Sequence, residues 1–421
     1  MVIAQVDPNA LSLTAWVTLH EELKKEGIID QIALSQRLQF NTASNPFLGA
    51  NLLPEVSQDN EVTEVMANIT IYPADESDPY SPVPVKDMGA TAKEVKYSLG
   101  NQDISYQMTA NDIDTLAKLA RNTDTGTLAI AQIITFYRNL ITSIMITNER
   151  SRWCTFLLRQ LERVGPNGYR ESVKYPGWDE SQYFRYLNAS NPLNWYNDEA
   201  DPIDVLQEER DRMWDDDGYA LKEIYMDRHI STILYRHPLI AMRANSYVGV
   251  NPGSGAGQPV QLQTFSHRAS NSQVNSYFTD NGLPIPIINA SHYSVENGGR
   301  RGFMYPPNVP PGRHYILLVG HIENPNLPWL DLDRLPLSNP NLLGYFGIGK
   351  LTGERVARRI INSKVQTFKP MNITAQGLQK GLPIIKSPYA YRVIIIDDPR
   401  KTGKAKTLLA NTKPNEYMKV A

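Results

Sequence analysis

The sequence predicts a mixed α+β fold in which one long helix is combined with many short strands. The first observation is residues 127–163, which contain no proline or glycine and carry apolar side chains at steps of three and four, the spacing of one helix face. The second is residues 67–108, where apolar and polar residues alternate in short runs typical of strands. The third is a pair of mostly apolar runs, 315–319 and 391–396, the second containing Arg392, which predict buried strands.

The long helix is predicted to be amphipathic. Its apolar stripe consists of Ile130, Ile134, Tyr137, Ile141, Ile144 and Met145. The opposite side carries Gln132, Arg138, Asn139, Thr142, Ser143 and Asn148. We expect Thr127 to be the N-cap and Gly165-Pro166 to end the helix. At about 1.5 Å per residue such a helix is roughly 55 Å long.

A helix of this length is typical of a coiled coil, a membrane span or a strut across a wide domain. The apolar stripe does not keep a strict heptad beyond Met145, which argues against a coiled coil. Arg138 and Asn139 interrupt the apolar run before the roughly 18 residues that a membrane span needs. The strut is the interpretation that remains.

The N-terminal quarter predicts segments with little core of their own. Residues 1–66 indicate an extended arm with a helix at 11–25 that Gly27 closes. Residues 67–108 predict a long two-stranded hairpin with a proline-rich tip at 73–89. Because an isolated two-stranded ribbon is marginal in water, we expect the hairpin to pack on another subunit. A hairpin folded onto its own domain is the open alternative.

The rest of the chain predicts short alternating elements. They are a strand pair at 169–186 with Gly177 at the turn, a helix at 202–214 capped by Asp201, a strand at 224–226, a helix at 228–244, strands at 285–288 and 315–319, a helix at 353–362 and a strand at 391–396.

Composition argues against several classes of protein. The 42 Lys and Arg nearly balance the 44 Asp and Glu, and a net charge of −2 argues against a dedicated nucleic-acid binder. A single cysteine, Cys154, allows no disulfide within the chain and fits a reducing compartment. The first 25 residues lack a basic region followed by an apolar core, so we expect no secretory signal.

Motifs that could carry chemistry are incomplete. Residues 344–350 have phosphate-loop spacing, but Leu351 replaces the hydroxyl residue that would hold Mg²⁺, and a tight backbone corner is the preferred interpretation. His229 and His237 are too far apart for a helical zinc pair, and the seven histidines are interpreted as hydrogen-bonding residues. Residues 215–218 lack the ligands of a calcium loop. We therefore expect no catalytic residue, metal site or cofactor.

The order of elements resembles the major capsid protein of tailed bacterial viruses, specifically the lambda-type capsid E family. The likeness spans residues 45–396 and has no short signature. It consists of the hairpin 68–108 leading into the long helix, the 175–195 segment before Asp201-Pro202, the Tyr225-Met226 strand before the helix at 230–238, Leu283-Pro284-Ile285-Pro286 with its turn, and Leu382-Pro383-Ile384 before the last strands.

The resemblance implies a capsid fold of the Hong Kong ninety-seven type with five parts. They are an N-terminal arm at 1–66, an extended hairpin loop at 67–110, a peripheral domain at 111–227 that contains the spine helix 127–163, an axial domain at 228–390, and at 391–421 a return strand of the peripheral domain with the C-terminal tail.

The resemblance further implies a structural protein, not an enzyme. It would assemble as hexamers and pentamers into an icosahedral phage head around double-stranded DNA, in the host cytoplasm, and would reside in the virion shell. Its partners would be its own copies, scaffold, portal and decoration proteins, and DNA held without sequence-specific contact, with no membrane. The expected contacts between subunits are Tyr72, Tyr80, Lys86, Tyr97 and Tyr106. The alternatives are a nucleotide-binding enzyme using 344–350, or a decoration or tail-tube protein.

Overall fold

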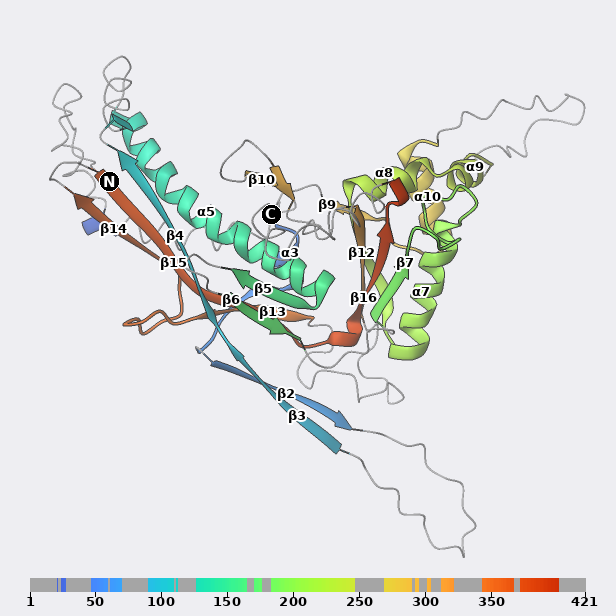
Figure 1. The fold of residues 1–421 in the computed structure, drawn as a ribbon, viewed down its shortest axis with the longest axis horizontal. Helices are drawn as coiled ribbons and strands as arrows, with labels where there is room; N and C mark the ends of the chain where they lie inside the picture. Colours follow the sequence, from blue (N-terminus) through green and yellow to red (C-terminus); the bar gives the residue numbers. More distant parts are fainter. Residues whose placement is uncertain are drawn as a thin grey trace, which may run out of the picture. The chain divides into compact units, whose positions relative to one another are not determined.

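The structure is a computed structural model of the 421-residue chain, and it has a mixed α+β fold (Figure 1). It describes residues 21, 24–27, 47–59, 61–69, 90–109, 111–112, 126–164, 170–175, 183–246, 269–289, 292–294, 301–303, 312–321, 343–366 and 372–400.

The chain divides into two compact units. The first comprises 1–63, 96–152 and 345–384, and the second comprises 64–95, 153–344 and 385–421. Each unit has its own sheet and its own buried core.

The first unit is built on a five-stranded sheet. Four strands follow the order β1 (Glu55–Ser57), β13 (Gly344–Gly349), β15 (Asn372–Ile385) and β14 (Ile360–Gln366), and β4 (Gly100–Thr109) also pairs with β15. The β4–β15 ladder is antiparallel and runs along the whole of β4. A short helix, α3 (Gly49–Leu52), precedes β1.

The long helix α5 (Gly126–Leu158) lies along β4 and β15 in Figure 1. Its buried apolar residues in this unit are Tyr137, Leu140, Ile141, Ile144 and Met145. Gly377 of β15 permits the close approach, because a Cβ there would lie 3.0 Å from the Ile144 Cδ1. The predicted apolar stripe is therefore confirmed from Tyr137 to Met145, with Leu140 added to it.

Both predicted ends of the long helix are wrong. The helix already includes Gly126, so Thr127 is not its N-cap. It ends at Leu158 because Arg159 has φ 54, a left-handed conformation that cannot continue the helix. The Arg159 guanidinium lies 4.9 Å from the Tyr183 ring centroid, a cation–π contact at the turn. The next residues form β5 (Gln160–Val164), paired with β6 (Arg170–Lys174).

The expected hairpin is present as a two-stranded sheet of β2 (Glu61–Ile69) and β3 (Ala90–Ser98), which we call the ribbon. It begins six residues earlier than predicted, at Glu61 and not at residue 67. The predicted strand around Tyr106 belongs to β4 and pairs with β15, so it is part of the first unit's sheet. The predicted tip at 73–89, and most of the helix predicted at 11–25, lie outside the described residues.

The second unit is built on another five-stranded sheet. Its strand order is β7 (Phe184–Leu187), β16 (Tyr391–Asp397), β12 (Arg313–His321), β8 (Ala220–Asp227) and β9 (Ile287–Asn289). The three middle strands are antiparallel, and each outer strand runs parallel to its neighbour. β16 is buried along its whole length, as predicted for 391–396. The sheet joins strands from both sides of the boundary expected at residue 227.

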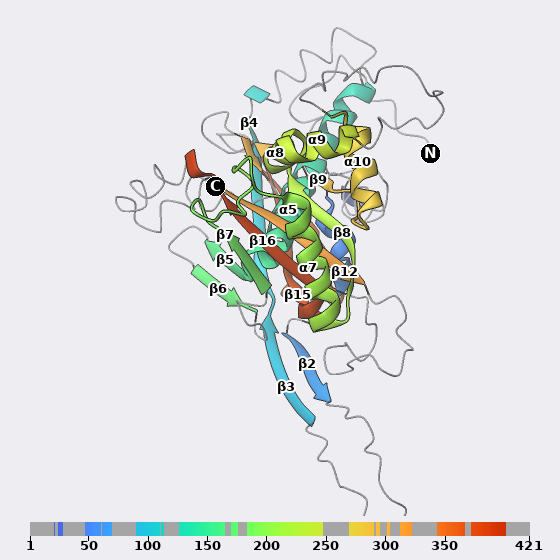
Figure 2. The ribbon, with the colours of Figure 1, turned by 90° about the vertical axis from the view of Figure 1, so that its right-hand side faces the viewer.

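Besides the end of α5, the described residues of the second unit contain four helices, which Figure 2 shows from the side. They are α7 (Pro202–Asp217), α8 (Arg228–Arg236), α9 (Pro238–Ser246) and α10 (Asn271–Asp280). α7 packs on β8 and β16. The predicted cap is confirmed, because the Asp201 Oδ1 accepts a hydrogen bond from the Ile203 amide at 3.0 Å. Gly218, at φ 73, ends the helix, which runs three residues past the predicted Trp214.

Three further predictions are wrong. The helix expected at 228–244 is two helices, because Pro238 offers no N–H and holds His237 extended, at φ −61 and ψ 129. The strand pair expected at 169–186 does not form, since β6 pairs with β5 and β7 with β16. The helix expected at 353–362 is a turn with Gly353 at φ 86, followed by β14, whose backbone bonds to β15. Smaller described elements are β10 (His292–Ser294), β11 (Arg301–Phe303) and the 3-10 turn η5 (Pro388–Ala390).

Candidate functional site

The five predicted contact residues have different positions in the structure. Tyr72, Tyr80 and Lys86 lie outside the described residues. Tyr97 on β3 is only 4% exposed, so its own chain already covers it. Tyr106 on β4 is 36% exposed, and its hydroxyl lies 2.7 Å from the Ser143 Oγ on α5. Of the two described tyrosines, Tyr106 therefore offers more surface to a neighbour, and the role of all five stays a prediction.

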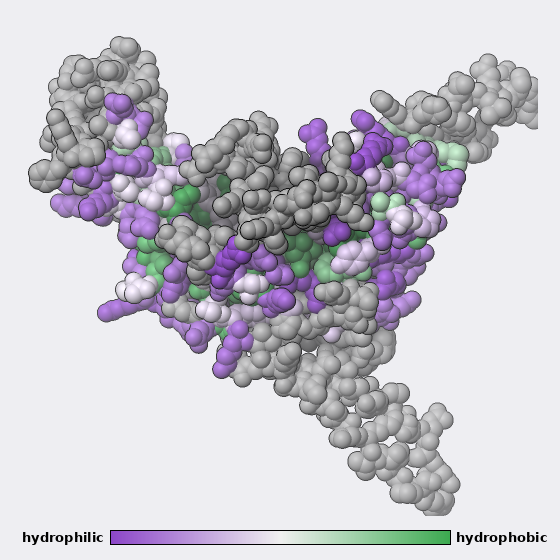
Figure 3. Space-filling model, in the orientation of Figure 1, coloured by the Kyte–Doolittle hydropathy of each residue, from purple (hydrophilic) through white to green (hydrophobic). Residues whose placement is uncertain are grey.

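Exposed apolar side chains lie at both edges of the second unit's sheet. Tyr186 on the edge strand β7 is 50% exposed, and Ile288 on the opposite edge strand β9 is 44% exposed. An edge strand presents unpaired backbone groups to its surroundings and is a template for another chain. Figure 3 shows that the described surface on this face is mostly hydrophilic, with apolar residues in small separate groups. The sheet edges are therefore candidate contact surfaces.

A chain of alternating charges is buried where α5 meets α3 and β1 in the first unit. The Glu149 carboxylate accepts a hydrogen bond from the Gly49 amide at 2.6 Å and pairs with the Arg152 guanidinium at 3.3 Å. Arg152 also lies 3.5 Å from the Glu55 carboxylate, which pairs in turn with Arg359. Two carboxylates and two guanidinium groups thus neutralise one another. We call these four residues, with their amide partners described next, the spine network.

Two amides extend the spine network to β15. Asn148 and Gln379 are both 0% exposed, and each side-chain amide donates to the oxygen of the other, at 3.3 and 3.4 Å. The Gln379 Oε1 also accepts from the Arg359 Nε at 2.6 Å. The prediction that Asn148 lies on the exposed side of the helix is wrong. Its partner is 231 residues away in the sequence, so the helical period could not indicate this contact.

Small residues make room for the spine network. A Cβ at Gly49 would lie 2.9 Å from the Glu149 Oε1, and one at Gly381 would lie 2.5 Å from the Phe346 Cε1. The Phe346 ring carries the Arg152 guanidinium, 4.8 Å from its centroid. The contacts of the spine network join α3, β1, α5 and β15, and through the Phe346 ring also β13. Every charge faces an opposite charge at close range, so the network has no evident chemistry of its own. Its sequence signal is a polar run, Asn148 to Arg152, inside an apolar helix.

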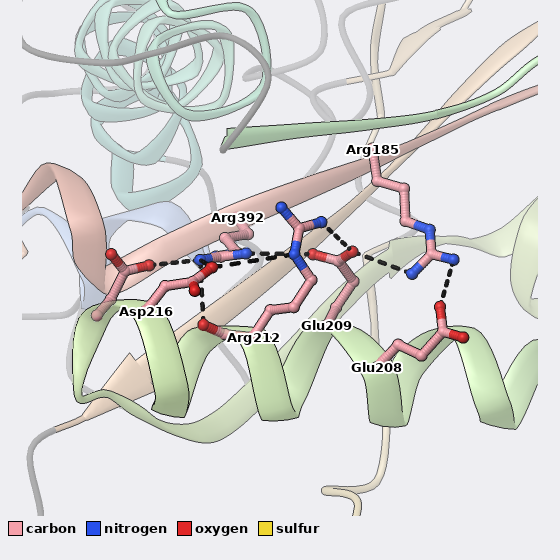
Figure 4. Close-up of polar contacts among 7 residues, drawn as sticks. Arg185, Glu208, Glu209, Arg212, Asp216 and Arg392 are labelled. Atoms are coloured by element: carbon pink, nitrogen blue, oxygen red, sulfur yellow. Dashed lines mark hydrogen bonds and ion pairs between the residues drawn. The ribbon is translucent and has the colours of Figure 1, made fainter.

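The second unit holds a different network, which fastens α7 to the sheet (Figure 4). Arg392 of β16 is 2% exposed and reaches Asp217 at 2.7 Å, Asp216 at 3.0 Å and Glu209 at 3.7 Å. Burial opposes the charged form of Arg392, but the hydrogen bonds to Asp217 and Asp216 prevail and raise the pKa of its guanidinium. We call this the clamp network.

The clamp network continues along α7 toward β7 (Figure 4). Arg185 of β7 pairs with Glu208 at 2.5 Å and with Glu209 at 3.1 Å. Arg212 pairs with the same Glu209 at 2.9 Å. Glu208 is 58% exposed and Glu209 only 2%, so the network runs from water into the core. The acids of residues 215–218 therefore end a helix, as predicted, and two of them also hold Arg392.

The glycine-rich stretch does not form a phosphate loop. Residues Gly344–Gly349 are the strand β13, and all six are buried between β1 and β15. Lys350 follows the strand and pairs with Asp59 at 2.7 Å. A phosphate loop needs free backbone amides between a strand and a helix, and residues 350–359 form no helix. Both the nucleotide-site alternative and the expected tight corner are wrong.

Within the described part of the chain, every helix is too short or too polar to cross a membrane.

Comparison with known proteins gives structural likeness only. No family profile matches the sequence, and no curated protein matches it. A structure described as a prophage capsid protein of Escherichia coli CFT073 superposes with TM-score 0.48 and 11% identity, covering 86% of this chain and 98% of that chain. A phage-related protein from Bordetella bronchiseptica RB50 superposes with TM-score 0.44 and 10% identity, covering 87% of this chain and 95% of that chain. An encapsulin from Synechococcus elongatus PCC 7942 superposes with TM-score 0.36 and 11% identity, covering 86% of this chain and 95% of that chain.

Each of these superpositions covers most of both chains, at low sequence identity. Superpositions of this quality establish no family for the chain, and the lambda-type assignment in particular has no support from them.

Proposed function

We propose that this chain is the subunit of an icosahedral protein shell, and specifically the major capsid protein of a tailed phage. In this proposal it assembles as hexamers and pentamers and encloses double-stranded DNA, with a structural and not a catalytic role. It resides in the virion, meets scaffold, portal and decoration proteins, and has no membrane partner.

The observation that supports the proposal most is the ribbon. Strand β3 leads through Leu99 directly into β4, which is fixed to β15 along its whole length. The ribbon, in contrast, is a sheet of two strands among the described residues. Two strands alone are marginally stable in water, so a ribbon of this kind gains stability from a surface that another chain provides. A subunit with its arm anchored at one end is suited to joining copies of itself.

The buried ion networks of both units are also consistent with the role of a shell subunit. The spine and clamp networks fix α5 and α7 to their sheets without any disulfide, since the chain has one cysteine. Contact between subunits can then bury apolar surface at about 25 cal/mol per Å², at edges such as Tyr186 and Ile288. The net charge of −2 suits a container that does not grip its DNA through counterion release.

The proposal also assigns the parts of the chain. Of the arm and hairpin expected at 1–66 and 67–110, the ribbon would reach neighbouring subunits, whereas β1 and β4 are strands of the first unit's own sheet. The peripheral domain would be 111–227 together with the last strand, and the axial domain would be 228–390. The last strand, β16, pairs with β12 and β7.

Electron microscopy of the purified chain tests the proposal directly. We expect closed shells for the wild type, formed alone or with a co-expressed scaffold. Deletion of residues 73–89 is expected to leave a folded subunit, with unchanged circular dichroism and thermal midpoint, that forms few shells. The matched control replaces 73–89 by a Gly-Ser linker of equal length, which keeps the connection and removes the side chains Tyr80 and Lys86. Shell formation at wild-type yield by both variants would show that the tip is dispensable.

The same images separate the other structural roles. Rods or small rings would indicate a tail-tube protein, and binding only to preformed shells would indicate a decoration protein. Shells recovered with nuclease-protected double-stranded DNA support a phage head. Shells that instead hold a cargo protein would support an encapsulin.

A further inference from the structure

A group of three metal-ligand side chains lies in the second unit, outside the networks already described. His314 is on β12, His229 is on α8, and Asp398 directly follows β16. Their ligand atoms all lie within 4.8 Å of one another. His314 and Asp398 are buried, whereas His229 is exposed. Three segments far apart in the sequence therefore bring two imidazoles and one carboxylate to one place.

His314 is held in the orientation of a metal ligand. Its Nδ1 lies 2.8 Å from the Asp227 Oδ2, and the other oxygen of Asp227 accepts from the Ile230 amide at 2.7 Å. A carboxylate that fixes one ring nitrogen sets the tautomer and leaves the other nitrogen as a lone-pair donor. The Nε2 of His314 faces the Tyr196 hydroxyl at 3.2 Å. The ligand nitrogen is thus prepared by a second carboxylate that is not itself a ligand.

Asp398 completes the buried side of the group. It is 2% exposed, and its Oδ1 accepts from the Arg400 amide at 2.9 Å. The Tyr196 hydroxyl faces both the Asp398 carboxylate and the His314 Nε2, and its single proton is donated to one of them at a time. The hydroxyl therefore bridges the two buried groups, in the place where a bound cation would meet both. On the open side, the His229 ring stacks on His314 with centroids 4.9 Å apart.

We propose that His229, His314 and Asp398 bind one divalent transition-metal ion of the zinc class. Two imidazoles and a carboxylate are ligands that Zn²⁺ prefers, at bond lengths of about 2.0–2.2 Å that bring neighbouring ligand atoms to roughly 3.3 Å. His229 is exposed and can turn out of its stack to close this distance, and the Tyr196 hydroxyl moves aside. Water fills the remaining position. The ion would join α8, β12 and the segment after β16, independently of shell assembly.

Titration of the metal-stripped full-length chain with ZnCl₂ tests the proposal by calorimetry. We expect saturable binding of one Zn²⁺ per chain and a higher thermal midpoint with Zn²⁺, and no response to equal Mg²⁺, because imidazole nitrogen is a poor ligand for hard cations. The decisive variant is His229→Ala. Because this side chain is exposed, the fold is retained, and affinity should fall by more than the roughly 10- to 100-fold typical of losing an outer partner.

Two control variants separate metal binding from packing. Tyr196→Phe removes the bridging hydroxyl but no ligand, so it should bind Zn²⁺ at least as tightly as the wild type. His321→Ala removes the histidine at the other end of β12 and should leave binding unchanged. The proposal is overturned if the wild type shows no saturable Zn²⁺ binding, or if His229→Ala binds as well as the wild type.

Discussion

The two units each bury a network of charges, but the charges differ in how many partners they have. In the spine network the Arg152 guanidinium lies near two carboxylates, those of Glu149 at 3.3 Å and Glu55 at 3.5 Å. In the clamp network Arg392 reaches three carboxylates, and one of them, Asp216, has a side chain that is 51% exposed. Burial alone therefore does not set how much an ion pair contributes to stability. The cost of losing a member depends on whether its partner retains another charge or water.

The largest effect is expected for Glu149→Gln in the spine network. The amide keeps the shape, but among the described residues Glu55, at 3.5 Å, is then the one carboxylate beside the buried Arg152 guanidinium. Breaking a buried pair in this way typically costs roughly 3–5 kcal/mol. Urea denaturation measures the loss, and amide exchange should increase first in α3 and β1.

The control for this variant is Glu354→Gln, which removes the exposed pair with Arg358. Its side chains are 31% and 41% exposed, so it should change stability by less than about 1 kcal/mol. Equal losses for Glu149→Gln and Glu354→Gln would contradict the role given to the spine network.

A smaller effect is expected for Asp217→Asn in the clamp network. Arg392 loses its 2.7 Å partner but keeps Asp216 at 3.0 Å and Glu209 at 3.7 Å. We expect a loss of about 1–3 kcal/mol, the range for a weakened buried hydrogen bond to a charged group. The matched control is Glu208→Gln, since Glu208 is 58% exposed and should contribute less than about 1 kcal/mol. If Asp217→Asn destabilises the chain as much as Glu149→Gln, the comparison of the two networks is wrong.

The smallest effect is expected from acid, through His237 in the second unit. Burial lowers the pKa of His237 below its usual 6.5, against the raising effects of the Asn197 carbonyl and of Asp198 and Asp201. The unfolded chain therefore binds a proton more readily than the folded chain. Stability is complete above pH 6.5 and falls as the pH drops through that value.

The variant His237→Gln tests this prediction. The Gln amide can still donate to the Asn197 carbonyl, which the His237 Nε2 contacts at 3.1 Å, but it cannot titrate. The fall in thermal midpoint between pH 7.5 and 5.5 should be smaller for the variant than for the wild type. Identical falls would show that His237 does not contribute.

Elements with strong local signals were predictable from the sequence. The cap at Asp201 with proline after it and the glycine that ends α7 act within a few residues, so the predicted start of α7 was correct and its end was close. The mostly apolar run 391–396 predicted the buried strand β16 for the same reason. The end of α5 was not predictable from the sequence. Arg159 adopts a left-handed conformation that arginine rarely takes, and no neighbouring residue type indicates a helix end there.

The candidate sites were far less visible. The spine network joins side chains as far as 304 positions apart, and each of its charged or amide residues alone looks like a surface residue. The sequence predicts only separate hydrogen-bonding roles for His229 and His314, since spacing along the chain says nothing of rings that stack across α8 and β12. The glycine spacing at 344–350 suggested a phosphate loop, and only the structure, in which Gly344–Gly349 form the buried strand β13, excludes that loop.

The sequence by itself determined the apolar face of α5, the main caps and the buried central strands, because periodicity and capping depend on neighbours along the chain. Only the tertiary structure decided that Asn148, Glu149 and Arg152 are interior residues, since a polar side chain can be buried only where distant partners satisfy it. The tertiary structure also decided which strands pair, because the backbone N–H and C=O groups at a strand's edge can bond to any strand that the fold brings beside it.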